Sequence, residues 1–124
     1  MRVPFPSTES GLAKARHMYI CVARDNATVL LAKCQSFKGY HLVPGSEPIC
    51  RLTEHPDSQR NPFRKPTLID LDKLFVAPVN ALDYTKRLNT GISDELLQEI
   101  LLQIEKCLPQ RISLAVEDLV RLNT

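Results

Sequence analysis

The sequence predicts a small α+β domain that is mostly β and carries one helix near its C-terminal end. Two short apolar runs with strand character, 17–23 and 28–34, follow one another closely, and a third covers 66–77. Residues 94–107 instead repeat apolar side chains at helical spacing. The chain has 124 residues, about one domain, and we therefore expect a single modest core.

The first two apolar runs are expected to form a β-hairpin. The run 17–23 stops at four polar or small residues, 24–27, and the run 28–34 then resumes the same character. Asp25 and Asn26 suit the turn, because their side chains bond to nearby backbone and tolerate positive φ.

The stretch 37–65 is expected to be mostly loop, because Gly and Pro residues recur in it and its periodicity fades. It contains one possible short strand, Ile49–Leu52. In the strand expected next, apolar residues alternate with Asp70 and Asp72, which places both carboxylates on the outer face. Such a pair could serve acid–base chemistry, hold a cation, or simply be solvated.

The helix expected from about Asp94 to Cys107 has the strongest local pattern. Ser93 can cap it, the acidic residues of its first turn suit the positive end of the helix dipole, and Pro109 ends it. Its apolar face comprises Leu96, Leu97, Ile100, Leu101, Ile104 and Leu108.

Two weaker helical patterns flank this helix. Val79 to Leu88 could form a short helical turn after Pro78, and Ser113 to Leu122 has a second, short helical pattern.

The composition, 44% hydrophobic and 24% charged, is that of an ordinary globular protein. No apolar run approaches the roughly 18 residues that a membrane-spanning helix needs, and the N-terminus lacks the apolar stretch of a signal peptide. We therefore expect a cytoplasmic protein without a membrane partner.

The four cysteines, Cys21, Cys34, Cys50 and Cys107, contain no C-x-x-C pair. They are expected to be small buried hydrophobic residues, since free cysteine is among the most buried residue types. A zinc site that uses Cys50 and His55 is the weaker alternative, and no disulfide framework is expected.

The net charge of +2 is unevenly distributed. Residues 1–65 hold ten Lys and Arg against five Asp and Glu, whereas residues 66–124 hold six against nine. A basic front half is compatible with binding a polyanion, although such an imbalance also arises by chance.

A group of polar residues flanks the expected hairpin at one end. Lys14, Arg16 and His17 precede its first strand, and Gln35, Ser36 and Lys38 end or follow its second. Cleaving RNA without a metal requires a proton acceptor, a proton donor and a cation for the phosphorane. The guanidinium of Arg16 suits the cation role and the imidazole of His17 can carry protons near neutral pH. The alternative is ordinary surface decoration of a strand end.

The long loop holds further basic residues next to aromatic ones, as single-stranded nucleic-acid binding uses. The alternative is a loop that is merely solvated. The residues concerned are His41, His55, Arg51, Arg60, Arg64 and Lys65, with Tyr40 and Phe63 as possible stacking surfaces.

The chain has no P-loop, no Rossmann glycine pattern, no H-E-x-x-H and no G-x-S-x-G motif. We expect neither a cofactor nor a metal ion.

The order of these segments resembles the MazF/PemK-like toxins of bacterial toxin–antitoxin modules. The segments that carry the resemblance are Val3–Pro6, Lys14–His17, Met18–Ala23, Cys34–Ser36, Leu68–Leu74 and Gly91–Leu97. The resemblance implies a small SH3-like β-barrel over 1–108, closed by a helix at 93–107, with 109–124 as a short helical tail of the same domain.

The resemblance also implies metal-independent endoribonuclease activity on single-stranded RNA, an antitoxin protein as partner, and a homodimer. The family's catalytic Arg corresponds to Arg16, and its hydroxyl residue falls on Gln35 or Ser36. With His17 as proton carrier these four residues form the expected catalytic set. The residues expected to bind substrate are Lys14, Lys38, His41, His55 and Arg64.

The alternative is a catalytically inactive barrel of the same fold that binds a protein or RNA. His17 stands where the family usually has Pro, and one of the two alignments places Gln35 at the hydroxyl position.

Overall fold

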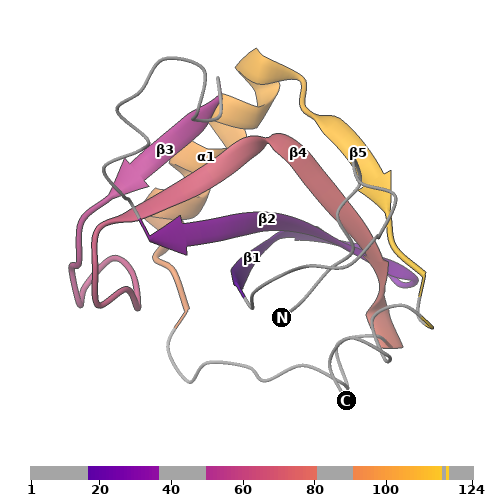
Figure 1. The fold of residues 1–124 in the computed structure, drawn as a ribbon, viewed down its shortest axis with the longest axis horizontal. Helices are drawn as coiled ribbons and strands as arrows, with labels where there is room; N and C mark the ends of the chain where they lie inside the picture. The colour runs from indigo at the N-terminus through magenta and orange to yellow at the C-terminus, as the bar shows by residue number, and fades with distance from the viewer. Residues whose placement is uncertain (1–16, 37–49, 81–90, 116, 118–124) are drawn as a thin grey trace.

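The computed structural model describes residues 17–36, 50–80, 91–115 and 117. In this part of the chain one five-stranded sheet curls into a half-barrel, and one helix lies against it (Figure 1). This confirms the expected mostly-β class with a helix near the C-terminal end. The elements are β1 (Met18–Arg24), β2 (Thr28–Ser36), β3 (Arg51–Glu54), β4 (Thr67–Pro78), α1 (Asp94–Cys107) and β5 (Gln110–Ser113).

The sheet has the order β1-β2-β4-β3, and β5 pairs in parallel with β4. The long strand β4 pairs with β3 through its first residues and with β5 through its last. Its register against β2 jumps, because Ala32 lies opposite Leu74 whereas the next residue, Lys33, lies opposite Asp70. The extra residues form a bulge, at which β4 bends and the sheet curls (Figure 1).

The predicted hairpin is confirmed as β1 and β2, which pair antiparallel. The Asp25 carboxylate holds the turn, because it accepts hydrogen bonds from the backbone N–H of Ala27 at 2.8 Å and of Thr28 at 2.7 Å. The same bonds lower the pKa of Asp25 below its usual value.

The sheet buries side chains on both faces. Alternation along the strands sends neighbouring residues, such as Leu31 and Ala32, to opposite sides. The face toward α1 holds the larger cluster, whose buried residues are Ile20, Val22, Ala32, Cys34, Cys50, Phe63, Ile69, Leu71, Leu74, Leu96 and Ile100. The opposite face holds Val29, Leu31, Phe75, Ala77 and Leu114, with Tyr19 packed edge-on against Phe75.

The helix has the predicted bounds, Asp94–Cys107, and the predicted cap. The Ser93 hydroxyl accepts a hydrogen bond of 3.1 Å from the backbone N–H of Leu96. The expected apolar face is wrong at Leu108, whose side chain is 83% exposed. Leu108 instead caps the helix in the left-handed conformation, with φ of 48°, and its N–H bonds to the Ile104 carbonyl.

The helical pattern expected from Ser113 to Leu122 is wrong at its start. Residues 110–113 form β5, and Leu114 is buried outside any helix, whereas Glu117 is helical and residues 118–122 lie outside the described residues. Pairing with β4 and burial against the Phe75 cluster favour the extended conformation. The tail 109–124 therefore begins as a strand.

Two short elements expected from the sequence are confirmed in part. The strand expected at Ile49–Leu52 is observed as β3, shifted toward the C-terminus, and Ile49 lies outside the described residues. Val79 and Asn80 form a 3₁₀ turn, whereas 81–88 lie outside the described residues.

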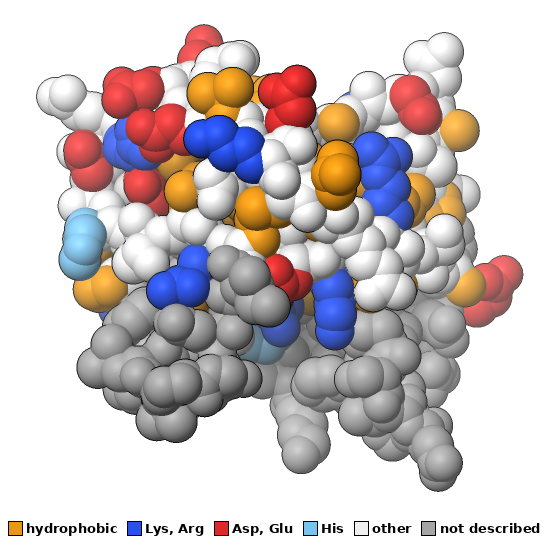
Figure 2. Space-filling model, turned by 90° about the horizontal axis from the view of Figure 1, so that it is seen from above, with side chains coloured by type: hydrophobic (Ala, Val, Ile, Leu, Met, Phe, Trp, Pro, Cys, Tyr) orange, Lys and Arg blue, Asp and Glu red, His pale blue; other side chains and the backbone are white. Residues whose placement is uncertain are grey.

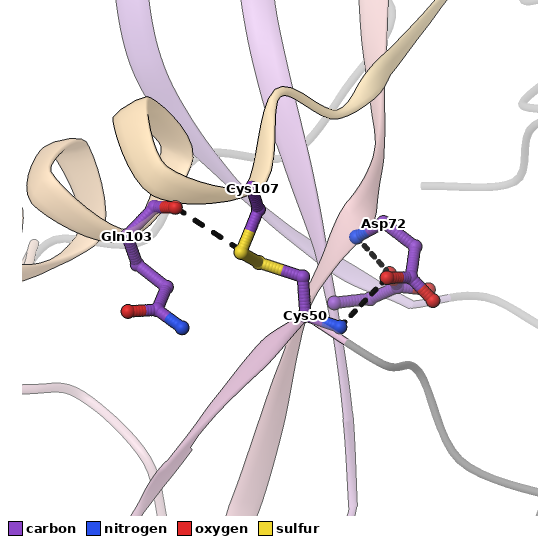
Figure 3. Close-up of a disulfide and its surroundings, with 5 residues drawn as sticks. Cys50, Asp72, Gln103 and Cys107 are labelled. Carbon is purple, nitrogen blue, oxygen red and sulfur yellow. Dashed lines mark hydrogen bonds between the residues drawn. A yellow bond between two sulfur atoms is a disulfide. The ribbon is translucent and has the colours of Figure 1, made fainter.

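Cys50 and Cys107 form a disulfide between the start of β3 and the end of α1 (Figure 3). The expectation that all four cysteines are unpaired hydrophobic residues is therefore wrong, and so is a zinc site that uses Cys50. Cys34 is buried as expected, and burial raises the pKa of its thiol to about 12. Cys21 is exposed. The pairing depends on how α1 packs, which spacing in the sequence does not reveal.

The disulfide is anchored to the bulge of β4. The Cys50 N–H donates a hydrogen bond of 2.7 Å to the Asp72 carboxylate, and the Leu71 N–H donates one of 2.9 Å to the Cys50 carbonyl. Figure 3 shows Cys50 and Asp72 below the end of α1, with Cys107 at the end of the helix.

None of the helices among the described residues is long and apolar enough to span a membrane.

Candidate functional site

A shallow hollow of about 230 Å³ lies at the open end of the β1–β2 hairpin. Three of the four residues expected to be catalytic line it, namely His17, Gln35 and Ser36. The other lining residues are Met18, Cys34 and Thr67.

The strand register explains why these residues meet. Met18 lies opposite Cys34, so the chain that enters β1 runs beside the chain that leaves β2. Ser36 lies opposite Thr67, so the first residue of β4 closes the group on its other side. The expected proximity of His17 to Gln35 and Ser36 is thereby confirmed.

The site combines exposed and partly covered groups. Ser36 is exposed, so its hydroxyl can reach a ligand, whereas His17 and Gln35 are half-buried. A histidine held at a strand end, beside an amide and a hydroxyl, can accept or donate a proton while its neighbours bind an anionic oxygen.

Four of the predicted site residues lie outside the described residues. They are Lys14, Arg16, Lys38 and His41. Arg16 immediately precedes His17 in the chain.

His55 and Arg64 are described, exposed, and absent from the lining of the hollow. Glu54 lies opposite Thr67, so His55 follows β3 at the same end of the sheet. Neighbouring strands lie about 4.8 Å apart, which puts the end of β3 about 10 Å from the end of β2. His55 therefore flanks the hollow, on its far side from His17.

Thr67 is a lining residue that the sequence analysis missed. Its side chain is largely buried, at 6% exposed for the residue, and its hydroxyl donates to the Lys65 carbonyl at 2.9 Å. Pairing the run 28–36 with the run 67–78 would have identified it, since both have strand character.

The possibility that Asp70 and Asp72 are simply solvated is wrong, because both are half-buried and bonded to backbone. The Asp70 carboxylate accepts from the Asp72 N–H at 2.9 Å, and Asp72 accepts from Cys50. Burial raises the pKa of Asp70 above its usual value, although Lys33 beside it opposes the shift. These bonds give the acidic pair a structural role at the bulge.

Tyr19 lies in the same cross-strand row as Lys33 and Asp70. Burial raises the pKa of its phenol well above the usual value. Its hydroxyl is buried and has no hydrogen-bond partner among the described residues.

Two residues of the loop that was expected to contact RNA stabilise the fold instead. Phe63 is buried in the core at 6% exposed, so it is not a stacking surface. Arg60 binds the carboxylates of Glu54, Glu95 and Glu99, and its hydrogen bonds to Glu54 and Glu99 raise its pKa. Figure 2 shows acidic side chains gathered toward one corner of the face it presents, with Lys and Arg side chains beside them.

No group of three or more His, Cys, Asp or Glu side chains in the described segments is arranged to hold a metal ion.

The chain matches no protein-family model, no curated protein and no solved structure.

Proposed function

We propose that this protein is a metal-independent endoribonuclease of the MazF/PemK toxin type, which cleaves single-stranded RNA and is paired with an antitoxin. The observation that carries the proposal is the hollow at the end of the hairpin. It gathers His17, Gln35 and Ser36, and Arg16 is the residue before His17 in the sequence. A curled, mostly-β sheet with a C-terminal helix is the architecture that the resemblance implies.

The proposed reaction is attack of a ribose 2′-oxygen on the adjacent phosphorus. His17 takes the 2′-OH proton, and the resulting imidazolium gives that proton to the departing 5′-oxygen as its bond to phosphorus breaks. The guanidinium of Arg16 binds the charged phosphorane, and the Ser36 hydroxyl with the Gln35 amide orients its oxygens. The products are a 2′,3′-cyclic phosphate and a 5′-hydroxyl end.

The size of the hollow fits this role. Sites for drug-sized ligands occupy about 300–1,000 Å³, whereas this hollow measures about 230 Å³. It therefore suits a phosphate and its two ester oxygens, while the rest of the RNA lies on the surface. Lys14, Lys38, His41, His55 and Arg64 are the residues proposed to hold that RNA.

The same proposal places the protein in the cytoplasm as a homodimer, where its antitoxin and its RNA substrates are found.

The test is cleavage of a long single-stranded RNA by the purified protein in EDTA. Arg16→Ala should slow cleavage by about 10²–10³-fold and His17→Ala by about 10²–10⁴-fold, as expected for a charge-stabilising group and a general base. Ser36→Ala should slow it less. The matched controls are Lys106→Ala and Ser113→Ala, which remove a charge and a hydroxyl from exposed positions away from the hollow.

Intact RNA at high protein concentration would reject the endoribonuclease. A mobility-shift assay on the same samples then separates two outcomes. Binding without cleavage would indicate the inactive RNA-binding barrel. An absence of binding would reject RNA as a ligand of this protein.

A further inference from the structure

A second hollow, of about 200 Å³, lies at the opposite end of the β1–β2 hairpin from His17. β1 has seven residues, each advancing about 3.3 Å, so the two hollows are about 20 Å apart. They are separate sites, and what binds one leaves the other open.

Two arginines from different elements line this second hollow. Arg24 ends β1 and Arg111 belongs to β5, and both are exposed. Neither forms an ion pair with any of the described residues. Two unpaired guanidinium groups on one hollow attract a ligand with carboxylate or phosphate oxygens.

Asp25 also lines the hollow, but its carboxylate is already engaged. It accepts hydrogen bonds from the N–H of Ala27, the N–H of Thr28 and the hydroxyl of Thr28. These three donors come from the turn itself. With two arginines and one aspartate, the hollow has a net positive charge. The guanidinium groups of Arg24 and Arg111 have no ion-pair partner among the described residues.

The floor of the hollow is aliphatic. Ala23, Leu30 and Val76 lie in one row across β1, β2 and β4. Leu30 packs partly against the core cluster that α1 covers, so this row lies on the same face of the sheet as α1. Leu30 and Val76 are only half-buried and leave apolar surface open.

We propose that this hollow docks an acidic polypeptide segment, with one apolar side chain on the row Ala23–Leu30–Val76 and carboxylates on Arg24 and Arg111. The volume is below that of sites for drug-sized ligands and suits a single side chain. An RNA backbone would use the arginines but gain little from the floor, because none of the lining residues is aromatic and a base has nothing to stack on. Arginines beside an apolar pocket are typical of protein-binding hot spots.

The test is fluorescence anisotropy with a labelled synthetic peptide in which glutamates flank one central leucine. Binding should weaken at least about tenfold in the double variant Arg24→Gln/Arg111→Gln, because charge-assisted hydrogen bonds are lost. Lys106→Gln loses a charge outside the hollow and should bind normally. A peptide with serine in place of the leucine should bind more weakly than the parent.

Three results would overturn the proposal. They are an absence of peptide binding, equal binding by the double variant, and displacement of the peptide by oligouridylate at similar concentrations, which would assign the hollow to nucleic acid. Both arginines are exposed, so an unchanged unfolding midpoint verifies that the variant is folded. The double variant should cleave RNA at the wild-type rate. Peptide binding therefore tests the docking site and RNA cleavage tests the endoribonuclease, and either proposal can fail without the other.

Discussion

Removing the Cys50–Cys107 disulfide should destabilise the protein strongly, because the bond closes a long loop. The two cysteines are 57 residues apart in the chain. In the chain-entropy description, closing a loop of that length restricts the unfolded chain by about 4 kcal/mol at 25 °C. Since a domain of this size is stable by only about 5–15 kcal/mol, the loss removes a large part of the total.

The assay is urea unfolding followed by circular dichroism, on wild-type protein with and without a phosphine reductant. With a denaturant slope of about 2 kcal/mol/M, reduction should lower the midpoint by about 2 M. The variant Cys50→Ala/Cys107→Ala should have a urea midpoint near that of the reduced wild type, and the reductant should not change it. Alanine is the better replacement, because Cys50 is buried and a serine hydroxyl there would add a cost of its own.

Two controls make the result specific. Cys21→Ser changes an exposed free thiol and should leave the midpoint unchanged. Thiol titration of the denatured, non-reduced protein should find Cys21 and Cys34 free and the other two blocked. Four free thiols, or equal midpoints with and without reductant, would refute the reasoning.

Three further predictions concern the fold around the site. Asn61→Ala removes four hydrogen bonds, to Glu54, His55, Asp57 and Phe63, and should cost about 2–3 kcal/mol in urea unfolding; a loss no larger than that of the exposed control Asn80→Ala would contradict it. Burial raises the pKa of Asp70, so its ionisation opposes folding as pH rises from about 4. Asp70→Asn lacks this cost, so its stability advantage over wild type should develop as pH rises from about 3 to about 7. An advantage present only at acid pH would be inconsistent with a raised pKa of Asp70. Ser93→Ala should cost about 1 kcal/mol, with Ser93→Asp restoring most of it, because both side chains cap α1; equal losses for the two variants would argue against the cap.

The elements that the sequence predicted well are those whose determinants are local. The bounds of α1 follow from Ser93 at one end and Pro109 at the other, and the hairpin turn follows from Asp25. Strand β4 follows from the apolar run 66–77 and from the alternation in its middle. These features depend on residues a few positions apart, which a sequence displays directly.

The features that were missed depend on contacts between distant segments. Cys50 meets Cys107 only because α1 ends above the start of β3. β5 extends because β4 offers it an edge, although its neighbours have a helical pattern. Phe63 and Arg60 look like loop residues in sequence, yet one fills the core and the other binds three glutamates.

The candidate site was predictable to the extent that it depends on the hairpin. An antiparallel pair brings the start of β1 to the end of β2, so His17 and Ser36 had to approach each other. Thr67 and the placement of His55 required the pairing of β4 with both β2 and β3. These pairings bring Ser36 and Glu54 opposite Thr67, from 31 and 13 positions earlier in the chain, and no local pattern indicates them.

The reaction proposed for the hollow at His17 is tested most directly with an end-labelled RNA that carries one 2′-deoxynucleotide at a mapped cleavage position, incubated with the protein in EDTA. Attack by the ribose 2′-oxygen predicts that this single substitution blocks cleavage there, and that cleaved unmodified RNA carries a 2′,3′-cyclic phosphate. Cleavage of the deoxy-substituted position at an equal rate, or RNA that stays intact in both forms, would contradict the proposed reaction.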